Sequence, residues 1–322
     1  MSTLFLFGNG FDLAHGLDTS YWNFRTFLSE NHPEVLFAFE RMYNILPLDN
    51  TEPWYTEEAQ NKWNKSVNKN LWKYFEEKMG NPDIDAMLDM SESVVGDLCL
   101  ADGAVDIRNT MDEYWCREYD FVNELSKYIE EWVEQIDISK ITVQKKILKN
   151  NNSDLFITFN YTGTLEEIYH VDPDHILHIH GSIEPYCDIA PIIGHGNIMD
   201  VKKYKKKSID ADEKFWEETA SIYNAISEYL NTLLKDTEQI ICRNASFFRK
   251  ISCIDNIVIL GLSFGDVDIP YLKIIKKSVS DQIKWNVYYY DDVAKKDLEK
   301  VFNVTNINIS KDCFRQSNEF WD

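Results

Sequence analysis

The chain has 322 residues and a formal net charge of −21, with 54 acidic side chains against 33 basic ones. A surface of this charge repels phosphate groups, so the composition disfavours a nucleic-acid partner and binding to an anionic membrane. The N-terminus shows no basic region followed by an apolar stretch, and no apolar run approaches the ~20 residues that cross a bilayer, so the cytoplasm is the expected compartment.

The spacing of the cysteines and one basic segment bear on three further possibilities: a zinc site, a disulfide framework and a nucleic-acid site. None of the six cysteines forms a Cys-x-x-Cys pair, which disfavours a structural zinc site, and a disulfide framework is not expected in a chain of this length. Five lysines lie between Lys202 and Lys207. We interpret them as a solvated loop or helix face rather than as a nucleic-acid site.

The first predicted element is a short strand. Residues 3–7 form an apolar run that stops at Gly8, which is typical of a strand buried on both faces of a parallel sheet. From Ser20 onward, apolar residues recur at helical spacing. Between about 32 and 152 strand-like runs disappear, and segments 71–78 and 121–136 have the spacing of amphipathic helices.

Alternation of strands and helices returns in the second half. Strands are predicted at 155–159, 175–180, 191–193, 256–260, 285–290 and 304–309, and helices at 164–169, 208–235 and 269–278. This order predicts an α/β fold with a Rossmann-like parallel sheet and helices on both faces. We expect a core of residues 1–32 and 151–322 and a helical insertion of residues 33–150.

Small and polar residues follow five of the predicted strands. They are Gly8-Asn9-Gly10, Asn160-Tyr161-Thr162, His180-Gly181-Ser182, Gly194-His195-Gly196 and Gly261-Leu262-Ser263. Open parallel sheets bind their ligands beyond the carboxyl ends of the strands. If the strands are parallel, these segments are therefore expected to surround one pocket.

The glycine turn at the N-terminus has two interpretations. Gly8 and Gly10 allow a tight turn and the close approach of a phosphate, or they only close a strand-to-helix turn. Leu13 stands where the third glycine of a Gly-x-Gly-x-x-Gly motif would be. Asp12 is expected to bond a ribose or to cap the next helix.

Asn160 and His180 are the candidate catalytic residues. A buried asparagine after a strand can hold a water molecule or a sugar hydroxyl, or it can close a turn by bonding its own backbone. A histidine at a strand tip can act as a general base near neutral pH, or serve a structural role. His178 alternates with His180 and is expected on the same face, and a further hypothesis joins both to His195 in a zinc site.

The segment after residues 256–260 contributes another candidate group. Gly261 and Ser263 are placed to approach a nucleotide. One of Asp266 and Asp268 is expected to cap the helix that begins near Ile269.

Residues 4–17, which contain Gly8-Asn9-Gly10-Phe11-Asp12, resemble the AbiH family of bacterial abortive-infection proteins. Segments 71–76, 159–162, 178–181 and 261–266 fit the same family. The resemblance spans the chain and implies a role in defence against bacteriophage.

The order of these segments is also similar to that of sirtuin-type folds. The resemblance implies that Gly8-Asn9-Gly10 is the nucleotide loop, Asn160 the catalytic asparagine, and His180-Gly181 the catalytic strand end. Thr162 stands where those proteins have an aspartate, and their zinc-binding cysteine quartet is absent. Bacterial defence proteins with sirtuin-like domains hydrolyse NAD, so the resemblance implies an NAD glycohydrolase.

Catalysis is accordingly assigned to His180 and Asn160. The residues expected to contact the nucleotide are Gly8, Asn9, Gly10, Phe11, Asp12, Thr162, Gly181, Gly261, Ser263 and Asp266. NAD or a related nucleotide is the expected substrate, with no metal, and a phage-derived trigger and a second copy of the chain are candidate partners. The alternatives are a non-catalytic, nucleotide-gated sensor module and a metal-dependent hydrolase built on His178, His180 and His195.

Overall fold

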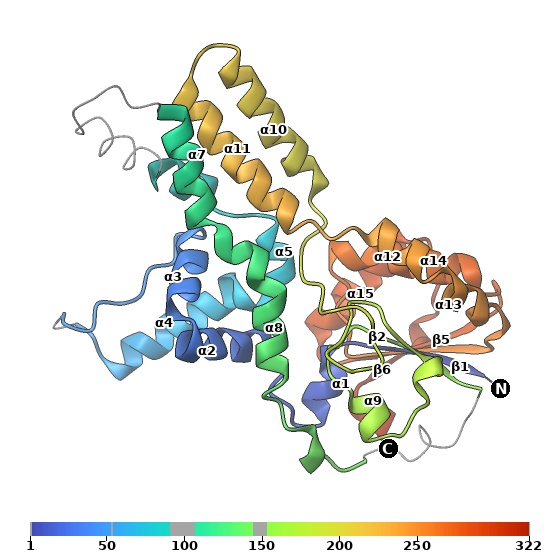
Figure 1. The fold of residues 1–322 in the computed structure, drawn as a ribbon. Coiled ribbons are helices and arrows are strands. Elements are labelled where there is room, and N and C mark those ends of the chain that lie inside the picture. Colours follow the sequence, from blue (N-terminus) through green and yellow to red (C-terminus); the bar gives the residue numbers. More distant parts are fainter. Residues whose placement is uncertain (1, 53, 91–106, 144–152, 322) are drawn as a thin grey trace. The chain divides into compact units, whose positions relative to one another are not determined.

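Figure 1 shows the computed structural model, which describes residues 2–52, 54–90, 107–143 and 153–321. Contacts divide the chain into two compact units. The first contains Met1–Ser20, Ile129–Ile192 and Asp236–Asp322, and the second contains Tyr21–Tyr128 and Ile193–Lys235. Residues 91–106 and 144–150 of the expected insertion lie outside the described residues. The expected domain boundaries remain a prediction.

The first unit is built on a six-stranded sheet. The strands are β1 (Thr3–Phe7), β2 (Leu155–Thr158), β3 (Ile176–His178), β4 (Asn256–Leu260), β5 (Lys284–Tyr289) and β6 (Phe314–Gln316). Their order is β3-β2-β1-β4-β5-β6, and every pair is parallel. This is the order of doubly wound Rossmann folds, and the direction of winding reverses between β1 and β4. The predicted α/β class is confirmed.

Side-chain alternation along β1 explains why helices cover both faces of the sheet. Leu4 and Leu6 lie in one apolar core, and Phe5 and Phe7 lie in another, because successive side chains of a strand point in opposite directions. The first core includes side chains from α12 (Thr237–Arg243), α13 (Ala245–Lys250), α14 (Ile269–Ser278) and α15 (Asp292–Val304). The second includes side chains from α1 (Asn9–Ala14), α9 (Thr164–Glu167) and α16 (Asn318–Trp321).

Two of the predicted strands are wrong. Residues 191–193 form a loop, in which the Ile192 amide bonds the carbonyl of His180. Residues 304–309 begin at the last residue of α15, and the Ile307 amide then bonds the carbonyl of Phe302. The apolar pattern there comes from a chain reversal that packs Ile307 against the helix end, while β6 supplies the sheet edge.

Helices make up the regular structure of the described residues between 21 and 143. They are α2 (Tyr21–Asn31), α3 (Pro33–Arg41), α4 (Glu57–Asn70), α5 (Phe75–Met79), α7 (Ile107–Glu118) and α8 (Leu125–Val133). Short 3-10 turns across the chain are η1 (Trp72–Tyr74), η2 (Asp120–Glu124), η3 (Ile138–Lys140), η5 (Pro173–His175), η6 (Ile251–Cys253), η7 (Asp266–Asp268) and η8 (Lys311–Cys313). No helix in the described ranges has both the length and the apolar character that a membrane crossing requires.

The second unit also contains a helical hairpin, α10 (Ile198–Asp212) and α11 (Glu217–Thr232), where one helix over 208–235 was expected. The lysine-rich segment 202–207 lies on the exposed face of α10, with Tyr204 buried beneath it, which confirms its interpretation as a solvated helix face.

The core of the second unit is aromatic and contains the buried carboxylate of Glu40. Trp72 stacks on Phe75 with ring centroids 4.6 Å apart, and its indole N–H donates to Glu40 over 2.7 Å. Arg25 forms an ion pair with the same carboxylate, also over 2.7 Å. Because a buried charge is costly unless it is paired, these two donors explain how Glu40 is tolerated here.

Candidate functional site

Three glycines bring the ends of β1 and β4 into backbone contact. The amides of Gly8 and Gly10 donate to the carbonyls of Leu260 and Gly261 over 3.0 and 3.1 Å. A Cβ on Gly10 would lie 2.5 Å from the Cα of Gly261, which itself has a φ of +70°. The glycines are therefore required for packing where the strand order reverses. Two amides expected to face a phosphate are already paired here.

Asp12 is a buried carboxylate that bonds across the fold. The hydroxyl of Thr162 donates to its Oδ2 over 2.6 Å, and that of Thr164 donates to its Oδ1 over 3.2 Å. Burial raises the pKa of Asp12 to about 6, although bonds from Thr162, Thr164 and Asn160 act in the opposite direction. The group can therefore exchange a proton close to neutral pH.

Asn160 links the second strand to the glycine turn. Its side-chain amide donates to the carbonyl of Gly8 over 3.2 Å, while its backbone amide donates to the hydroxyl of Thr158 over 3.1 Å. The side chain thus bonds a neighbouring strand end rather than its own turn. Two of the predicted groups, Asn160 and the glycine turn, are brought together.

His178 forms a buried pair with Glu166, a residue that the sequence did not single out. The Nε2 of His178 lies 2.8 Å from Glu166 Oε1, and its Nδ1 lies 3.2 Å from the carbonyl oxygen of Asn160. Both ring nitrogens face acceptors, so the ring carries two protons, or Glu166 holds one of them. The other carboxylate oxygen of Glu166 is buried and has no hydrogen-bond partner among the described residues.

His180 sits in an aromatic pocket beside a carboxylate. Its ring centroid lies 5.2 Å from that of Phe159 and 5.6 Å from that of Tyr271. Its Nε2 lies 3.5 Å from Asp268 Oδ1, and the other oxygen of Asp268 accepts from the Gly265 amide. A carboxylate beside an imidazole nitrogen can stabilise the charge that the ring acquires when it acts as a general base. Asp268 stands at the N-cap position of α14, but its side chain bonds the Gly265 amide ahead of η7 instead of the helix, and its other oxygen faces this ring.

The expectation that His178 and His180 share a face is wrong. β3 ends at His178, and Gly181, with a φ of +76°, turns the chain just beyond it. His178 contacts Glu166 on α9, which packs on one face of the sheet, whereas His180 contacts Tyr271 on α14, which packs on the other. The alternation rule fails because the strand ends before the second histidine.

His195 belongs to the second unit and has a structural environment. Its Nδ1 accepts from the amide of Asn197 over 3.0 Å, and a Cβ on Gly80 would lie 2.8 Å from its ring. Burial lowers the pKa of His195 to about 4. Within the described ranges, no group of three or more histidine, cysteine, aspartate or glutamate side chains is arranged to hold a metal ion.

The other predicted contact residues fall into two environments. Phe11 is buried and stacks on Phe7, with centroids 4.3 Å apart, and a Cβ on Gly181 would lie 2.2 Å from the Ala190 carbonyl oxygen. Both therefore pack in the interior. Ser263 and Asp266 are exposed, and Asn9 is half-buried.

Two further loop residues in this part of the protein are a phenylalanine with a strained backbone and a glutamate with a raised pKa. Phe264 is buried with a φ of +48°, a conformation that is rare for a bulky residue and typical of functional loops. Burial and the charges of Glu166 and Glu167 raise the pKa of Glu184. With Asp12, this part of the protein therefore contains two carboxyl groups whose pKa is raised by burial.

Comparisons with known proteins support one family. A search of the curated proteins gave no significant match, and a search of the solved structures gave none either. The family described as "Bacteriophage abortive infection AbiH" matches residues 4–289, a range that includes both Asp12 and Asn160. Because the match covers most of the chain, this protein belongs to the AbiH family of bacteriophage abortive infection proteins.

Proposed function

We propose that this protein defends its host by hydrolysing NAD to nicotinamide and ADP-ribose at the carboxyl edge of the sheet. One observation carries the proposal. Asn160 is bonded to Gly8 beside the point where the strand order reverses, and the His180–Asp268 pair lies at the end of the next strand. Dinucleotides bind at this position in doubly wound sheets.

The proposed reaction breaks the bond between ribose C1′ and the nicotinamide nitrogen. The bonding electrons leave with nicotinamide, and an oxocarbenium-like centre remains on the ribose. Water attacks that carbon and gives its proton to His180, whose charge Asp268 stabilises. Asn160 orients the ribose and the water by exchanging its bond with Gly8 for bonds to the ligand.

Burial of the two proposed catalytic side chains supports a triggered enzyme. His180 is 4% exposed and Asn160 is 7% exposed, so a ligand reaches them only after the surrounding loops move. The loop of residues 261–265 is the proposed moving part, since Phe264 holds a strained left-handed backbone conformation there, while Gly261 stays packed against Gly10. A phage-derived trigger would supply the free energy for opening.

The test is release of nicotinamide from NAD by the full-length protein, measured by chromatography with and without lysate of phage-infected cells. Cleavage that falls by about 10²–10⁴-fold in the His180→Ala variant supports the proposal. His175→Ala is the matched control, because this histidine lies in η5, ahead of β3. Full activity of the His180→Ala variant would show that the reaction occurs elsewhere or by another mechanism.

A non-catalytic sensor is the second candidate, and the burial of His180 and Asn160 favours it, because neither side chain is open to a substrate. Such a module binds a nucleotide without consuming it. Calorimetric binding of NAD, with intact NAD recovered after incubation with infected-cell lysate, would establish the sensor and overturn the enzyme.

A further inference from the structure

The tip of the α10–α11 hairpin exposes two large aromatic side chains. The two helices pack along their length, and the chain reverses between them at residues 213–216 (Figure 1). Phe215 is 89% exposed and Trp216 is 56% exposed at this reversal. Exposed rings of this size contribute nothing to a core, and aromatic residues are enriched in the anchors of protein interfaces.

The backbone conformation at the tip is one that phenylalanine rarely adopts. The amide of Trp216 donates to the Ala211 carbonyl, and that of Phe215 donates to the Asp212 carbonyl, which is the bonding pattern of a Schellman helix end. Phe215 has a φ of +58° at the position where glycine is normally found. A phenylalanine that is both strained and exposed is not explained by the stability of the isolated fold.

The residues that flank these rings in the sequence form an acidic collar, in which Asp212 is paired with Arg108. Residues 209–218 contain five carboxylates and one lysine. The amine of that lysine, Lys214, lies 4.8 Å from the Trp216 ring centroid. The collar repels anionic membranes and nucleic acids, so the matching surface is an apolar pocket with a positive rim.

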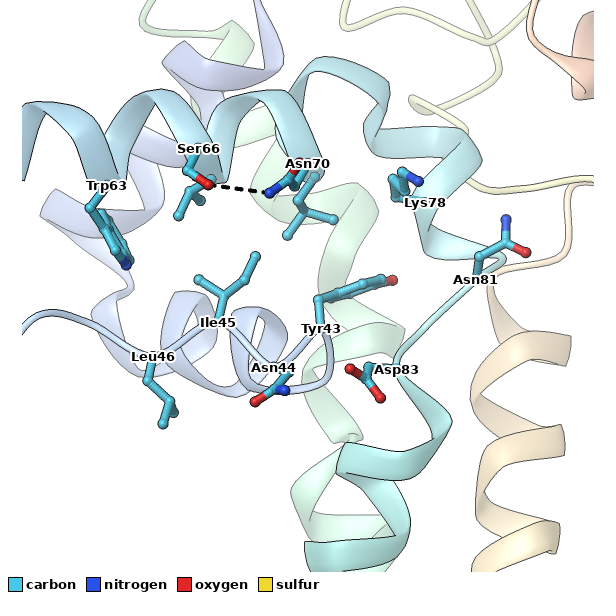
Figure 2. A pocket seen from close by; sticks show the side chains of 12 residues that line it. Tyr43, Asn44, Ile45, Leu46, Trp63, Ser66, Asn70, Lys78, Asn81 and Asp83 are labelled. Carbon is cyan, nitrogen blue, oxygen red and sulfur yellow. Dashed lines mark hydrogen bonds between the residues drawn. The ribbon is translucent and has the colours of Figure 1, made fainter.

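A groove in the second unit has a mixed lining, in which six of the twelve residues are aromatic or aliphatic. It has a volume of about 730 Å³ and lies between α4 and the segment that follows α3 (Figure 2). Trp63 and Val67 line it from α4, and Ile45 and Leu46 line it from the opposite side. A cavity of roughly 150 Å³ accepts benzene, so this groove has room for two aromatic side chains.

The helix that lines the groove carries exposed lysines, although the chain is strongly acidic. Lys78 and Asp83 line the groove itself, and Lys62 and Lys69 are exposed on α4. Residues 60–79 contain five lysines and two glutamates, in a chain whose net charge is −21. The exposed lysines of α4 are therefore complementary in charge to the acidic tip, and the apolar part of the groove can accept its rings.

We propose that the Phe215–Trp216 tip of one copy of this protein binds in the α4 groove of a second copy. Within a single chain the tip is exposed and does not line the groove, so the proposed contact joins two molecules. Tip and groove are different surfaces, which makes the contact head-to-tail, and repetition of it closes a ring or extends a filament. The partner is thus another copy of this chain, and the interaction is independent of the proposed enzymatic reaction.

The first test is sedimentation velocity of the full-length protein over a wide range of concentration. The wild type is expected to associate reversibly, and Phe215→Gly is expected to raise the dissociation constant at least about tenfold. Glycine suits the left-handed backbone at this position, so this variant keeps its fold and its melting temperature does not fall. Tyr290→Gly is the control, because Tyr290 is exposed elsewhere in the chain.

The second test exchanges charges between the two surfaces. One variant carries Asp210→Lys and Glu213→Lys at the tip, and the other carries Lys62→Glu and Lys69→Glu beside the groove. Each alone is expected to associate more weakly than the wild type, and a mixture of the two is expected to restore association. A wild type that stays monomeric, an unchanged association of Phe215→Gly, or a mixture that does not associate would each overturn the proposal.

Discussion

The side-chain amide of Asn160 donates to the carbonyl oxygen of Gly8 over 3.2 Å, joining two strand ends that are 152 residues apart in the chain. Asp12, four residues after Gly8, accepts from Thr162 and Thr164 on the Asn160 side of the same junction. The buried polar network thus bridges β1 and β2 beside the reversal of strand order. The contribution of this network to the stability of the protein and the pKa of Asp12 can be tested separately.

Gly10→Ala is expected to destabilise the protein by about 1–3 kcal/mol, because the new methyl group would overlap the backbone of Gly261. Urea unfolding measures the loss. Gly16→Ala is the control: Gly16 has a φ of +78°, but a Cβ there meets no atom within 4 Å. Equal losses in both variants would mean that the close approach of the two strand ends contributes nothing beyond backbone strain.

Asp12→Asn is expected to change the pH dependence of stability. The carboxyl of Asp12 has a pKa of about 6 when folded, against 3.8 as its ordinary value. The folded state therefore binds the Asp12 proton more tightly than the unfolded state does. The resulting stabilisation is fully present below pH 3.8 and is lost as pH rises through about 6. The wild type should lose about 3 kcal/mol relative to Asp12→Asn across this interval.

Urea unfolding of both proteins at intervals from about pH 4 to about pH 7 measures this difference, and the raised pKa of Asp12 sets the window. Only the difference between the two proteins is used, which removes the contribution of other titrating groups. Parallel profiles would show that Asp12 titrates alike in the folded and unfolded chains.

His178 and Glu166 are expected to be energetically coupled. Removing one partner leaves the other buried without its bond, so His178→Ala or Glu166→Gln alone should cost about 3–5 kcal/mol. A double-mutant cycle should give a coupling energy of about 1–3 kcal/mol. The exposed pair Lys300–Asp297 is the reference, with an expected coupling below about 0.5 kcal/mol. A coupling at His178–Glu166 no larger than at this reference would contradict the buried pair.

Asp268→Asn is expected to lower the turnover of NAD by about 10²-fold if His180 is the general base, because the imidazolium loses its stabilising charge. The Michaelis constant should change little, since Asp268 contacts the histidine and not the ligand. The pH–rate profile provides a second readout, and its acidic limb should move to lower pH in the variant. An unchanged profile would show that Asp268 does not affect the proton-transfer step.

Much of the fold follows from local sequence pattern. Apolar runs that stop at small residues correctly predict the strands β1, β2 and β4, and helical spacing correctly predicts α14. These patterns are sufficient because a strand buried on both faces must be continuously apolar, whatever packs against it. Pattern alone was misleading at 304–309, where a helix end buries an apolar residue that mimics a strand.

The sequence by itself determined the α/β class and the AbiH resemblance, because both depend on short segments read in order. Only the tertiary structure decided that Glu166 pairs with His178, that Asp268 faces His180, and that the two histidines lie on opposite faces of the sheet. Such contacts join elements that are distant along the chain. They are set by the packing of whole strands and helices, and local periodicity carries no information about that packing.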